Sequence, residues 1–498
     1  MACERLEHLT AGMPIPFGGD KLTRAPEALA AAFKPGDRLI VMQDTGELLH
    51  VPAGVHALTA AAVGEACEAF QQLRSVPRDR ITDFFEEFAR RLEAEASWAP
   101  IAAANAADVE GAKRRGRSTT RLVATPKMRQ EMIAGLRNWR DAPAADERVV
   151  EQVDHPGWSV AQVTAPLGVV AFVFEGRPNV FADAAGVIRG GNTVVFRIGS
   201  DALGTARAIA EHALKPALAA AGLPPRAAVL LESAERSAGW AMFSDRRLSL
   251  AVARGSGAAV AQLGAVARQA GVPVSLHGTG GAWMIAADDA DPDRFRAAVA
   301  GSLDRKACNT LNVCCLVGGG RLVGPFLEGL KAAGERLGHG CKLHVVSGAE
   351  HLPAEWTGAT TTVRRADGDH EEPLVEPLAE SGLAAEWEWE ETPEVSLVVA
   401  PDLEAAVALF NRYSPQFIVS VIAKDAAARD YVWANANAGF VGDGMTRWVD
   451  GQYAFKRPEL GLSNWEHGRL LARGGVLSGD SVYTIRTRMH QRDADLHR

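Results

Sequence analysis

The sequence predicts an α/β protein with a doubly wound, mostly parallel sheet, followed by a second α/β block. The main observation is that short apolar strands alternate with helical stretches from residue 162 onward, at the spacing of βαβ units. The run at 167–174 is apolar and rich in β-branched residues, as in a strand that is buried on both faces. A chain of 498 residues is also long enough for two to four domains of about 150 residues each.

The first part of the chain differs in pattern from the rest. Two short strands, at 34–42 and 48–51, flank the turn Asp44-Thr-Gly-Glu and indicate a small β unit. Residues 1–56 are therefore predicted to be an N-terminal extension.

Residues 57–139 are predicted to be helical. Apolar side chains recur there at three- and four-residue spacing, namely Phe84, Phe85, Phe88, Leu92 and Ala96. This spacing is typical of one buried helix face, and Thr82 or Asp83 would cap that helix.

The α/β region continues with a regular order of elements. A short helix is predicted at 184–189 and a longer one at 202–221, with strands at 193–196, 228–231, 249–253, 272–276 and 283–286. The second α/β block is predicted to run from about residue 278 to 386.

The charge is distributed unevenly. The chain has 53 Lys and Arg against 61 Asp and Glu, a net charge of −8. Residues 366–394 hold eleven Asp and Glu and no Lys or Arg, and we interpret most of this stretch as solvated surface. No basic stripe with interleaved aromatic residues occurs, which argues against nucleic-acid binding.

Neither a membrane segment nor a disulfide framework is predicted. No run reaches the roughly 20 apolar residues that a bilayer span requires, and the N-terminus is polar. The six cysteines form no CxxC pair, which favours reduced thiols and a cytoplasmic protein. His339, Cys341 and His344 lie close together but are too few for a zinc site, so no metal is predicted.

Two predicted strand-to-helix turns suit a phosphate group. Gly199 and Ser200 precede the helix at 202–221, and Arg254, Gly255 and Ser256 follow the strand at 249–253. Glycine permits a tight turn there, and a helix N-terminus offers free N–H groups. The alternative is that both are ordinary βα turns, because neither has the full GxGxxG spacing.

One cysteine stands apart from the rest. Cys308 follows Arg305 and Lys306, whose charges would favour the nucleophilic thiolate. The alternative is an inert buried cysteine, which is the more common case. Cys314 and Cys315 lie in an apolar run and are interpreted as strand core.

Several motifs, in this order, resemble the glutamate-5-semialdehyde dehydrogenase (γ-glutamyl phosphate reductase) family of the aldehyde dehydrogenase superfamily. The resemblance covers about residues 57–488. Its motifs are Ala104-Asn-Ala-Ala-Asp-Val-Glu, Pro166-Leu-Gly-Val-Val, Glu175-Gly-Arg-Pro-Asn, Gly191-Asn-Thr-Val-Val-Phe-Arg, Ala253-Arg-Gly, Cys308-Asn, Asn411-Arg-Tyr, Glu459-Leu-Gly-Leu-Ser and Leu471-Ala-Arg-Gly. Ordered motifs over this length are far more specific than any one of them.

The resemblance implies the aldehyde dehydrogenase fold and a covalent mechanism. Cys308 falls at the family nucleophile, which attacks an acyl phosphate and forms a thioester that a nicotinamide cofactor then reduces to the aldehyde. Asn179 falls at the position whose side-chain amide stabilises the oxyanion.

A missing carboxylate agrees with this reaction. Hydrolytic aldehyde dehydrogenases carry a glutamate that activates water in a Glu-Leu-Gly-Gly-like motif. Here the matching stretch is Leu276-His-Gly-Thr-Gly-Gly, which has none, and we interpret His277 as a strand-end residue. Without a general base the thioester is protected from water, as a reductase requires.

The resemblance also implies the cofactor and its contacts. Arg197 stands where many relatives carry a lysine that contacts the adenosine ribose. A guanidinium there matches a 2′-phosphate, which favours NADPH. Glu391 lies near the acidic residue of the family that contacts the ribose.

Arg177, Thr446 and Arg447 resemble family positions close to the acyl substrate, and an arginine suits a carboxylate. The chain departs from the family pattern at Gly176, after Asn411-Arg-Tyr and in the stretch 441–448. The leading substrate is γ-glutamyl phosphate, in proline biosynthesis. The alternatives are another carboxylated acyl phosphate, a carrier thioester, or a non-catalytic relative that uses residues 1–56 for binding.

The resemblance implies a division of the chain. The dinucleotide domain is expected at 57–146, 165–273 and 391–448, the catalytic domain at 274–390, and oligomerisation segments at 147–164 and 449–488. A hairpin of this kind needs a partner edge, so a homodimer or homotetramer is expected. Association with the amino-acid kinase that acts before it is a further expectation.

Overall fold

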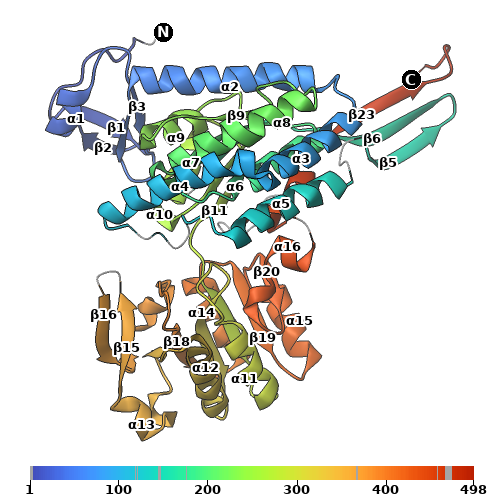
Figure 1. Ribbon diagram of the computed structural model, residues 1–498. Helices are drawn as coiled ribbons and strands as arrows, with labels where there is room; N and C mark the ends of the chain where they lie inside the picture. Colours follow the sequence, from blue (N-terminus) through green and yellow to red (C-terminus); the bar gives the residue numbers. More distant parts are fainter. Residues whose placement is uncertain are drawn as a thin grey trace. The chain divides into compact units, whose positions relative to one another are not determined.

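The computed structural model describes most of the chain and divides it into two compact units, shown with their elements in Figure 1. The described residues are 4–117, 119, 122–143, 147–174, 176–365, 368–456, 458–465 and 474–497. The first unit comprises Met1–Gly278, Arg457–Gly461 and Leu477–Arg498. The second comprises Thr279–Lys456 and Leu462–Val476.

The first unit contains a five-stranded parallel sheet, as the sequence predicts. Its strands are β7 (Val169–Phe174), β8 (Thr193–Ile198), β9 (Ala228–Leu230), β10 (Leu250–Arg254) and β11 (Val274–His277). Their order in the sheet is β11-β10-β7-β8-β9, and every pairing is parallel. The chain therefore runs outward from β7 to β9 and then returns to the other side of β7.

Helices cover both faces of this sheet, which confirms the doubly wound class. They are α6 (Val180–Ala185), α7 (Leu203–Ile209), α8 (Lys215–Ala220), α9 (Arg236–Phe243) and α10 (Gly257–Gln269), with the π-helical turn Ala210–Leu214 between α7 and α8. Phe172 and Phe196 pack into one core with α6 to α8. Ala171 and Val173, on the alternate face, pack into a second core with α9 and α10.

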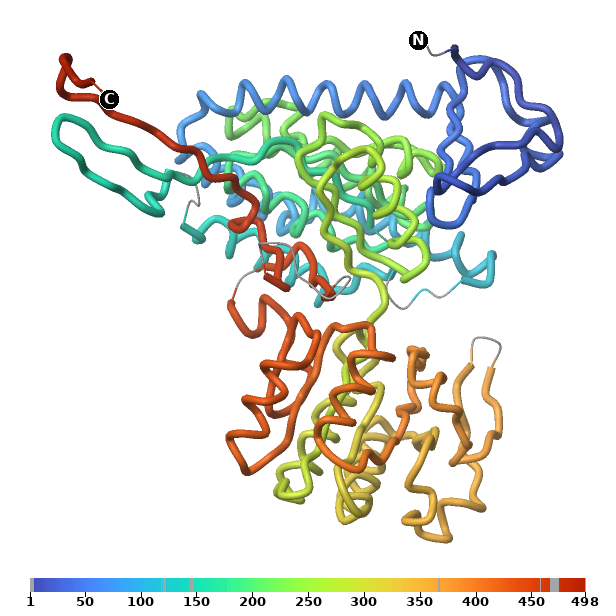
Figure 2. Tube along the Cα trace, turned by 180° about the vertical axis from the view of Figure 1, so that it is seen from behind, coloured from blue at the N-terminus to red at the C-terminus, as the bar shows by residue number. Residues whose placement is uncertain are grey.

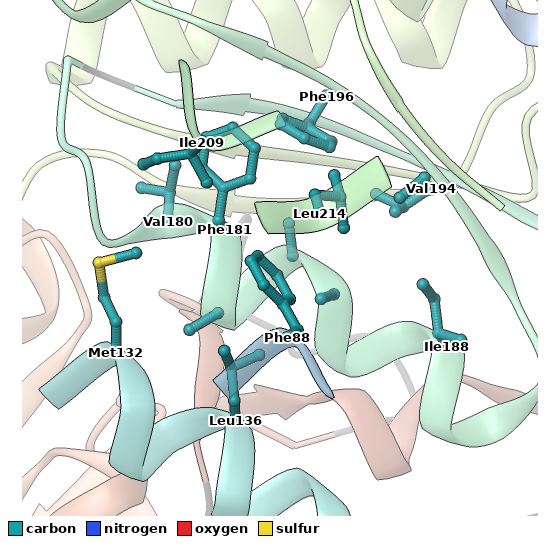
Figure 3. Close-up of a cluster of buried hydrophobic side chains, with 14 of the residues drawn as sticks. Phe88, Met132, Leu136, Val180, Phe181, Ile188, Val194, Phe196, Ile209 and Leu214 are labelled. Atoms are coloured by element: carbon teal, nitrogen blue, oxygen red, sulfur yellow. The ribbon is translucent and has the colours of Figure 1, made fainter. Parts of the chain in front are cut away.

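Four helices precede the sheet, namely α2 (Ala53–Leu73), α3 (Arg78–Glu93), α4 (Glu95–Arg114) and α5 (Pro126–Asp141). The predicted apolar stripe lies on α3, where Phe84, Phe85, Phe88 and Leu92 are fully buried. Figure 3 shows Phe88 among the side chains of this core.

The predicted cap of this helix was wrong. Helix α3 begins at Arg78, after Pro77, four residues before Thr82. The Thr82 hydroxyl instead donates to the Arg78 carbonyl and accepts a hydrogen bond from Arg189 Nη1 (2.8 Å). Threonine within a helix commonly makes such back-bonds, so a hydroxyl alone does not locate a cap.

The N-terminal extension is a pair of hairpins within the first unit. Strands β1 (Pro14–Phe17) and β2 (Lys21–Arg24) are antiparallel, and so are β3 (Arg38–Val41) and β4 (Leu48–Val51). The second hairpin confirms the two strands predicted around Asp44. Between the hairpins lies the short helix α1 (Glu27–Ala32).

The second unit contains a seven-stranded parallel sheet. Its strands are β12 (Ala282–Ala286), β13 (Leu311–Val317), β14 (Lys342–Val345), β17 (Val375–Pro377), β18 (Glu394–Ala400), β19 (Ile418–Ile422) and β20 (Phe440–Gly442). Their order is β17-β14-β18-β13-β12-β19-β20. Helices α11 (Pro292–Gly301) and α12 (Val323–Leu337) pack on one face, and α14 (Leu403–Tyr413) and α15 (Ala426–Asn435) pack on the other.

This sheet corrects one predicted boundary. Residues 391–448 were assigned to the dinucleotide domain, but they supply β18, β19 and β20 to the second unit. The reason is long-range pairing, since β18 joins β13 and β14 while β19 joins β12.

Most of the acidic stretch is solvated, as predicted, but part of it is not. Six of its described acidic residues are exposed, but Glu372, Glu376 and Glu386 are half-buried and Glu394 is buried. Each of these four pairs with a cation, and Lys342 contacts both Glu372 and Glu376. Glu372 lies on the hairpin of β15 (Thr360–Arg365) and β16 (Gly368–Pro373).

A separate three-stranded sheet belongs to the first unit. Strands β5 (Val149–His155) and β6 (Trp158–Pro166) form the predicted hairpin, and β23 (Tyr483–Gln491) pairs with β6 along its whole length. Figures 1 and 2 show these strands side by side. The predicted segment 449–488 is split, because α16 (Gly451–Ala454) lies in the second unit and β23 in the first.

Two short strands, β21 (Glu459–Leu462) and β22 (Val476–Ser478), complete the fold. Among the described residues, none of the helices is long and apolar enough to cross a membrane.

Candidate active site

Cys308 lies in a closely packed loop of the second unit, between α11 and β13. A Cβ atom on Gly280 would come within 2.5 Å of the Cys308 Cα, so only glycine fits there. The N–H of Gly281, which has a φ of +98°, donates to the Cys308 carbonyl (2.8 Å). Thr310 Oγ donates to the Arg305 carbonyl (2.6 Å), which fixes the other side of the loop. The backbone around Cys308 is therefore held from both directions.

The other cysteines in the described part of the chain lie in largely apolar surroundings. Cys314 and Cys315 are fully buried in β13, as predicted, and burial raises the pKa of Cys315 to about 12. Burial likewise raises the pKa of Cys341 to about 12. Cys67 is half-buried in α2, and burial raises its pKa too. Cys308 is partly buried too and packs against a small apolar cluster that includes Phe417 and Phe440, but it differs in that its loop also carries the charged residues Asp304, Arg305 and Lys306.

The two cations before Cys308 have different surroundings. Lys306 Nζ lies 2.8 Å from Glu386 Oε1, and both side chains are nearly buried. The expected effect of Lys306 on the thiol is therefore offset by a carboxylate. Arg305 is exposed and forms no ion pair within the described residues.

Thr446 and Arg447 come to the same loop. Thr446 is buried; its Oγ donates to the Asn309 carbonyl (2.7 Å) and its N–H donates to Ser302 Oγ (2.9 Å). Arg447 Nε donates to Asp304 (2.6 Å). Thr446 therefore supports the Cys308 loop with its hydroxyl, and Arg447 is held to the same loop through Asp304.

Two glutamates of the acidic stretch, Glu391, which was expected near the cofactor ribose, and Glu386, lie in different surroundings. Glu391 is exposed, and its carboxylate lies 3.4 Å from His339. Glu386 contacts Lys306 and also accepts a hydrogen bond from Gly280 N (2.7 Å). Sequence reasoning missed Glu386 because local pattern does not distinguish it from its acidic neighbours.

In the first unit, the edge formed by the carboxyl ends of the strands suits a dinucleotide. Strands β7 and β10 are neighbours from which the chain leaves in opposite directions, and ligands bind at such a switch point. Ser256 occupies the cap position of α10, and its side chain accepts no cap hydrogen bond within the described residues. The first N–H groups of α10 and the Ser256 hydroxyl thus fit a pyrophosphate, as predicted for the turn at Gly255.

The other predicted phosphate turn is already occupied by protein. Asp108 accepts hydrogen bonds from both the N–H (2.6 Å) and the hydroxyl (2.7 Å) of Thr205, at the start of α7. After Gly199 and Ser200, Asp201 pairs with two arginines. The turn follows β8, one strand away from the switch point. It is therefore the weaker candidate for a phosphate.

The two predicted cofactor arginines bind protein groups. Arg197, at the end of β8, is 7% exposed and donates to the carbonyls of Ala234 and Glu235 (3.1 Å each). Burial lowers its pKa, and the charge of Arg236 lowers it further. Arg254 donates to Glu459 and to the Leu460 carbonyl (3.2 Å each). Arg254 thus fixes the segment at Glu459 and Leu460. Arg197 lies near a second cation, Arg236.

The loop after β7 carries the remaining two predicted residues. Asn179 directly precedes α6, and its Oδ1 atom is buried without a hydrogen-bond partner in the described part of the chain. Arg177, two residues earlier, is half-buried. An amide that the protein leaves incompletely bonded suits contact with a ligand.

A parallel doubly wound sheet with a free helix N-terminus, and a cysteine in a second α/β unit, define a class of nucleotide-dependent oxidoreductases that act through a thiol. The chain belongs to the aldehyde dehydrogenase family, because residues 40–332 match the model of that family. Enzymes of this family use NAD or NADP.

Individual relatives narrow the resemblance to one branch of the family. The γ-glutamyl phosphate reductase of Gluconobacter oxydans is 30% identical over 363 residues, 72% of this chain and 77% of the relative. That of Afipia carboxidovorans is 28% identical over 451 residues, 87% of this chain and 95% of the relative. The crystal structure of γ-glutamyl phosphate reductase from Thermotoga maritima matches with a TM-score of 0.73 and 22% identity, over 88% of this chain and 100% of that one. These matches confirm the predicted fold and family.

Proposed function

We propose that the chain is an NADPH-dependent reductase that converts L-glutamyl 5-phosphate to L-glutamate 5-semialdehyde, a step in proline biosynthesis. The observation that carries the proposal is Cys308, a cysteine held in a polar loop of a chain that resembles γ-glutamyl phosphate reductases. The same chemistry would apply to any carboxylated acyl phosphate.

In the first step the Cys308 thiolate attacks the acyl carbon, and the carbon–oxygen bond to phosphate breaks. Phosphate leaves with the bonding electrons, and a thioester remains on Cys308. The side-chain amide of Asn179 donates a hydrogen bond to the oxygen that becomes negative. A neutral donor serves this purpose without protonating the thiolate.

The cofactor, when bound, supplies a hydride to the thioester carbonyl. Asn179 again stabilises the negative oxygen, and the carbon–sulfur bond then breaks to release the aldehyde and the thiolate. Ser256 and the N-terminus of α10 would hold the pyrophosphate. Arg197 and Arg236 form a cationic pair that favours a 2′-phosphate.

Water is kept from competing by the absence of a base in the motif that hydrolytic relatives use. Residues 276–281 contain no Asp or Glu. Glu386 contacts the Cys308 loop, but both of its carboxylate oxygens are already engaged, one by Lys306 and one by Gly280 N. The thioester therefore persists until it is reduced.

The substrate carboxylate would be bound by Arg177 or by the terminal nitrogens of Arg447, since a guanidinium pairs well with a carboxylate. The departures from the family pattern at Gly176 and in residues 441–448 flank these two arginines. They would alter the acyl pocket and leave the chemistry at Cys308 unchanged.

The exposed apolar side chains of the three-stranded sheet favour a homo-oligomer. They are Val149, Val150, Val153, Ile485 and Met489. We propose that this sheet pairs with another copy of the chain, because its outer strands leave unpaired edges. Light scattering should then show a dimer or tetramer.

The reaction is tested most directly in reverse. Purified protein, glutamate-5-semialdehyde and NADP⁺ are mixed with and without phosphate, and the absorbance of reduced cofactor is followed. Phosphate-dependent reduction of NADP⁺ is expected, and Cys308→Ser should lower the rate by at least about 10⁴-fold with cofactor affinity unchanged. A protein that binds NADPH but gives no signal would shift the proposal to another acyl phosphate or thioester. A protein that binds no dinucleotide would favour the non-catalytic alternative.

A further inference from the structure

Glu386 connects the two loops that hold the catalytic cysteine. Its Oε1 atom lies 2.8 Å from Nζ of Lys306, two residues before Cys308. Its Oε2 atom accepts a hydrogen bond from the N–H of Gly280 (2.7 Å), whose Cα packs against the Cys308 backbone. One carboxylate thus ties together the strand-entry loops of β12 and β13.

The backbone on both sides of Glu386 is held by a single side chain. Asn312 Nδ2 donates to the carbonyl of Ala385 (2.8 Å), and Asn312 Oδ1 accepts from the N–H of Trp387 (2.9 Å). Asn312 is 5% exposed and lies on β13, four residues after Cys308. The indole of Trp387 is in turn fixed by a hydrogen bond to Ser396 (2.8 Å). Glu386 is therefore held at a defined place relative to the cysteine.

The charges around this pair are balanced. Lys306 and Glu386 are 8% and 17% exposed, so water screens them only weakly. Arg447 and Asp304 form a second pair beside the loop, and Arg305 is exposed. The ring of His344, which is bonded to Glu394, stacks on Trp387 at 3.8 Å.

We propose that the Lys306–Glu386 pair is a positioning device for Cys308, in which the carboxylate fixes both loops and each charge offsets the effect of the other on the thiol. This rests on the proposed function only in taking Cys308 as the nucleophile. The pair touches the backbone of the cysteine loops, so Lys306 and Glu386 are positioning residues.

The proposal predicts shifts of opposite sign when the two charges are removed one at a time. Glu386→Gln leaves a buried cation near Cys308, which stabilises the thiolate. Lys306→Met leaves a buried anion, which destabilises it. Each shift should be about one pH unit, because both charges lie on segments that pack against the Cys308 loop and are only partly screened. A merely structural role would move both variants in the same direction.

The test measures the pH dependence of Cys308 alkylation by iodoacetamide, with the labelled peptide quantified by mass spectrometry and without any substrate or cofactor. The midpoint should fall by about one unit in Glu386→Gln and rise by about one unit in Lys306→Met. The double variant should return to within about 0.3 units of the original chain, because both charges are gone. Glu390→Gln, which removes an exposed carboxylate, should leave the midpoint unchanged.

Shifts of the same sign, or no shift in either variant, would overturn the proposal. Unfolding of a single variant would show as labelling of Cys314 and Cys315. In that case the double variant decides. If it is folded and alkylates Cys308 with the original pH midpoint, the proposed role of the Lys306–Glu386 pair is supported. If it is as unfolded as the single variants, the proposal is overturned. Because no substrate is used, the result does not depend on which acyl group the enzyme accepts.

Discussion

The two parallel sheets carry their candidate functional residues at opposite ends of the strands. In the first unit, Arg197 ends β8, and Gly255 and Ser256 follow the end of β10. In the second unit, Gly280 precedes β12 and Cys308 precedes β13. One sheet thus uses its carboxyl edge and the other its amino edge.

The difference follows from the direction of the helices. A helix that begins after a parallel strand points its N–H groups at the carboxyl edge, which attracts an anion without special side chains. The amino edge receives helix C-termini instead, such as the end of α11 at Gly301. A site there needs side chains to shape it. Thr310 binds the backbone of the Cys308 loop, Glu386 binds the N–H of Gly280, and Asn312 binds the backbone on both sides of Glu386.

The largest predicted effect in the first unit concerns the loop after β7. Asn179→Ala should lower kcat by about 10²- to 10³-fold, because it removes the donor to the developing oxyanion. The Kd for NADPH should stay within about twofold, since the proposed pyrophosphate contacts are made by the N-terminus of α10. Steady-state kinetics and fluorescence titration measure the two quantities. A variant that loses cofactor affinity and keeps kcat would assign Asn179 to the cofactor site instead.

In the second unit, Glu372 should make the stability sensitive to acid. Hydrogen bonds from Arg365 and Lys342 lower the pKa of Glu372 to about 2, against partial burial, which raises it. Because the folded pKa is depressed, this stability is fully present above pH 4.5 or so and is lost as the pH falls towards 2. Glu372→Gln should therefore cost about 2 kcal/mol at pH 7 and much less near pH 2.5.

Urea unfolding at both pH values, followed by tryptophan fluorescence, measures this difference. Glu355→Gln removes an exposed carboxylate of the same unit and serves as the control. An equal loss of stability at pH 7 and pH 2.5 would mean that Glu372 acts through packing and not through its charge.

Sequence reasoning worked best where the determinants are local. A continuous apolar run is a buried parallel strand almost by necessity, so β7 and β8 were predicted within two residues of their bounds. The turn at Gly255 was found because a strand, a glycine and a helix follow each other directly. Cys308 was singled out by the two cations that precede it, whereas its predicted role and that of Asn179 came only from the resemblance to a family.

The features that the sequence did not predict share a cause, which is that they depend on contacts between segments far apart in the chain. The strand β18 joins the second sheet through β13, about 80 residues earlier in the chain, and no local pattern carries that pairing. Glu386 was not singled out from its acidic neighbours, because the groups that engage it, Lys306 and Gly280, lie 80 and 106 residues earlier in the chain. For Arg197, whose contact with the cofactor stays a prediction, the sequence did not show that the loop after β9 supplies carbonyls that engage part of its guanidinium.

A charge at the start of α10 should separate cofactor binding from stability. Ser256→Asp adds a carboxylate that caps the helix and repels a pyrophosphate. NADPH binding should weaken by about 10- to 100-fold, while the free energy of unfolding rises by about 0.5–1 kcal/mol. Ser256→Ala, which adds no charge, should weaken binding only a few-fold. Tighter or unchanged binding in Ser256→Asp would place the pyrophosphate elsewhere.

The smallest effect should appear at the other end of the cofactor. Arg197→Met keeps the bulk of the side chain at the end of β8 but removes its charge, leaving Arg236 as the nearby cation. The Kd for NADPH should rise about 5- to 10-fold more than the Kd for NADH, because only NADPH carries a 2′-phosphate. The carbonyls of Ala234 and Glu235 lose a donor in the same variant, so both cofactors should also bind somewhat more weakly. The ratio of the two Kd values removes that common loss, and an unchanged ratio would show that Arg197 only holds the loop after β9.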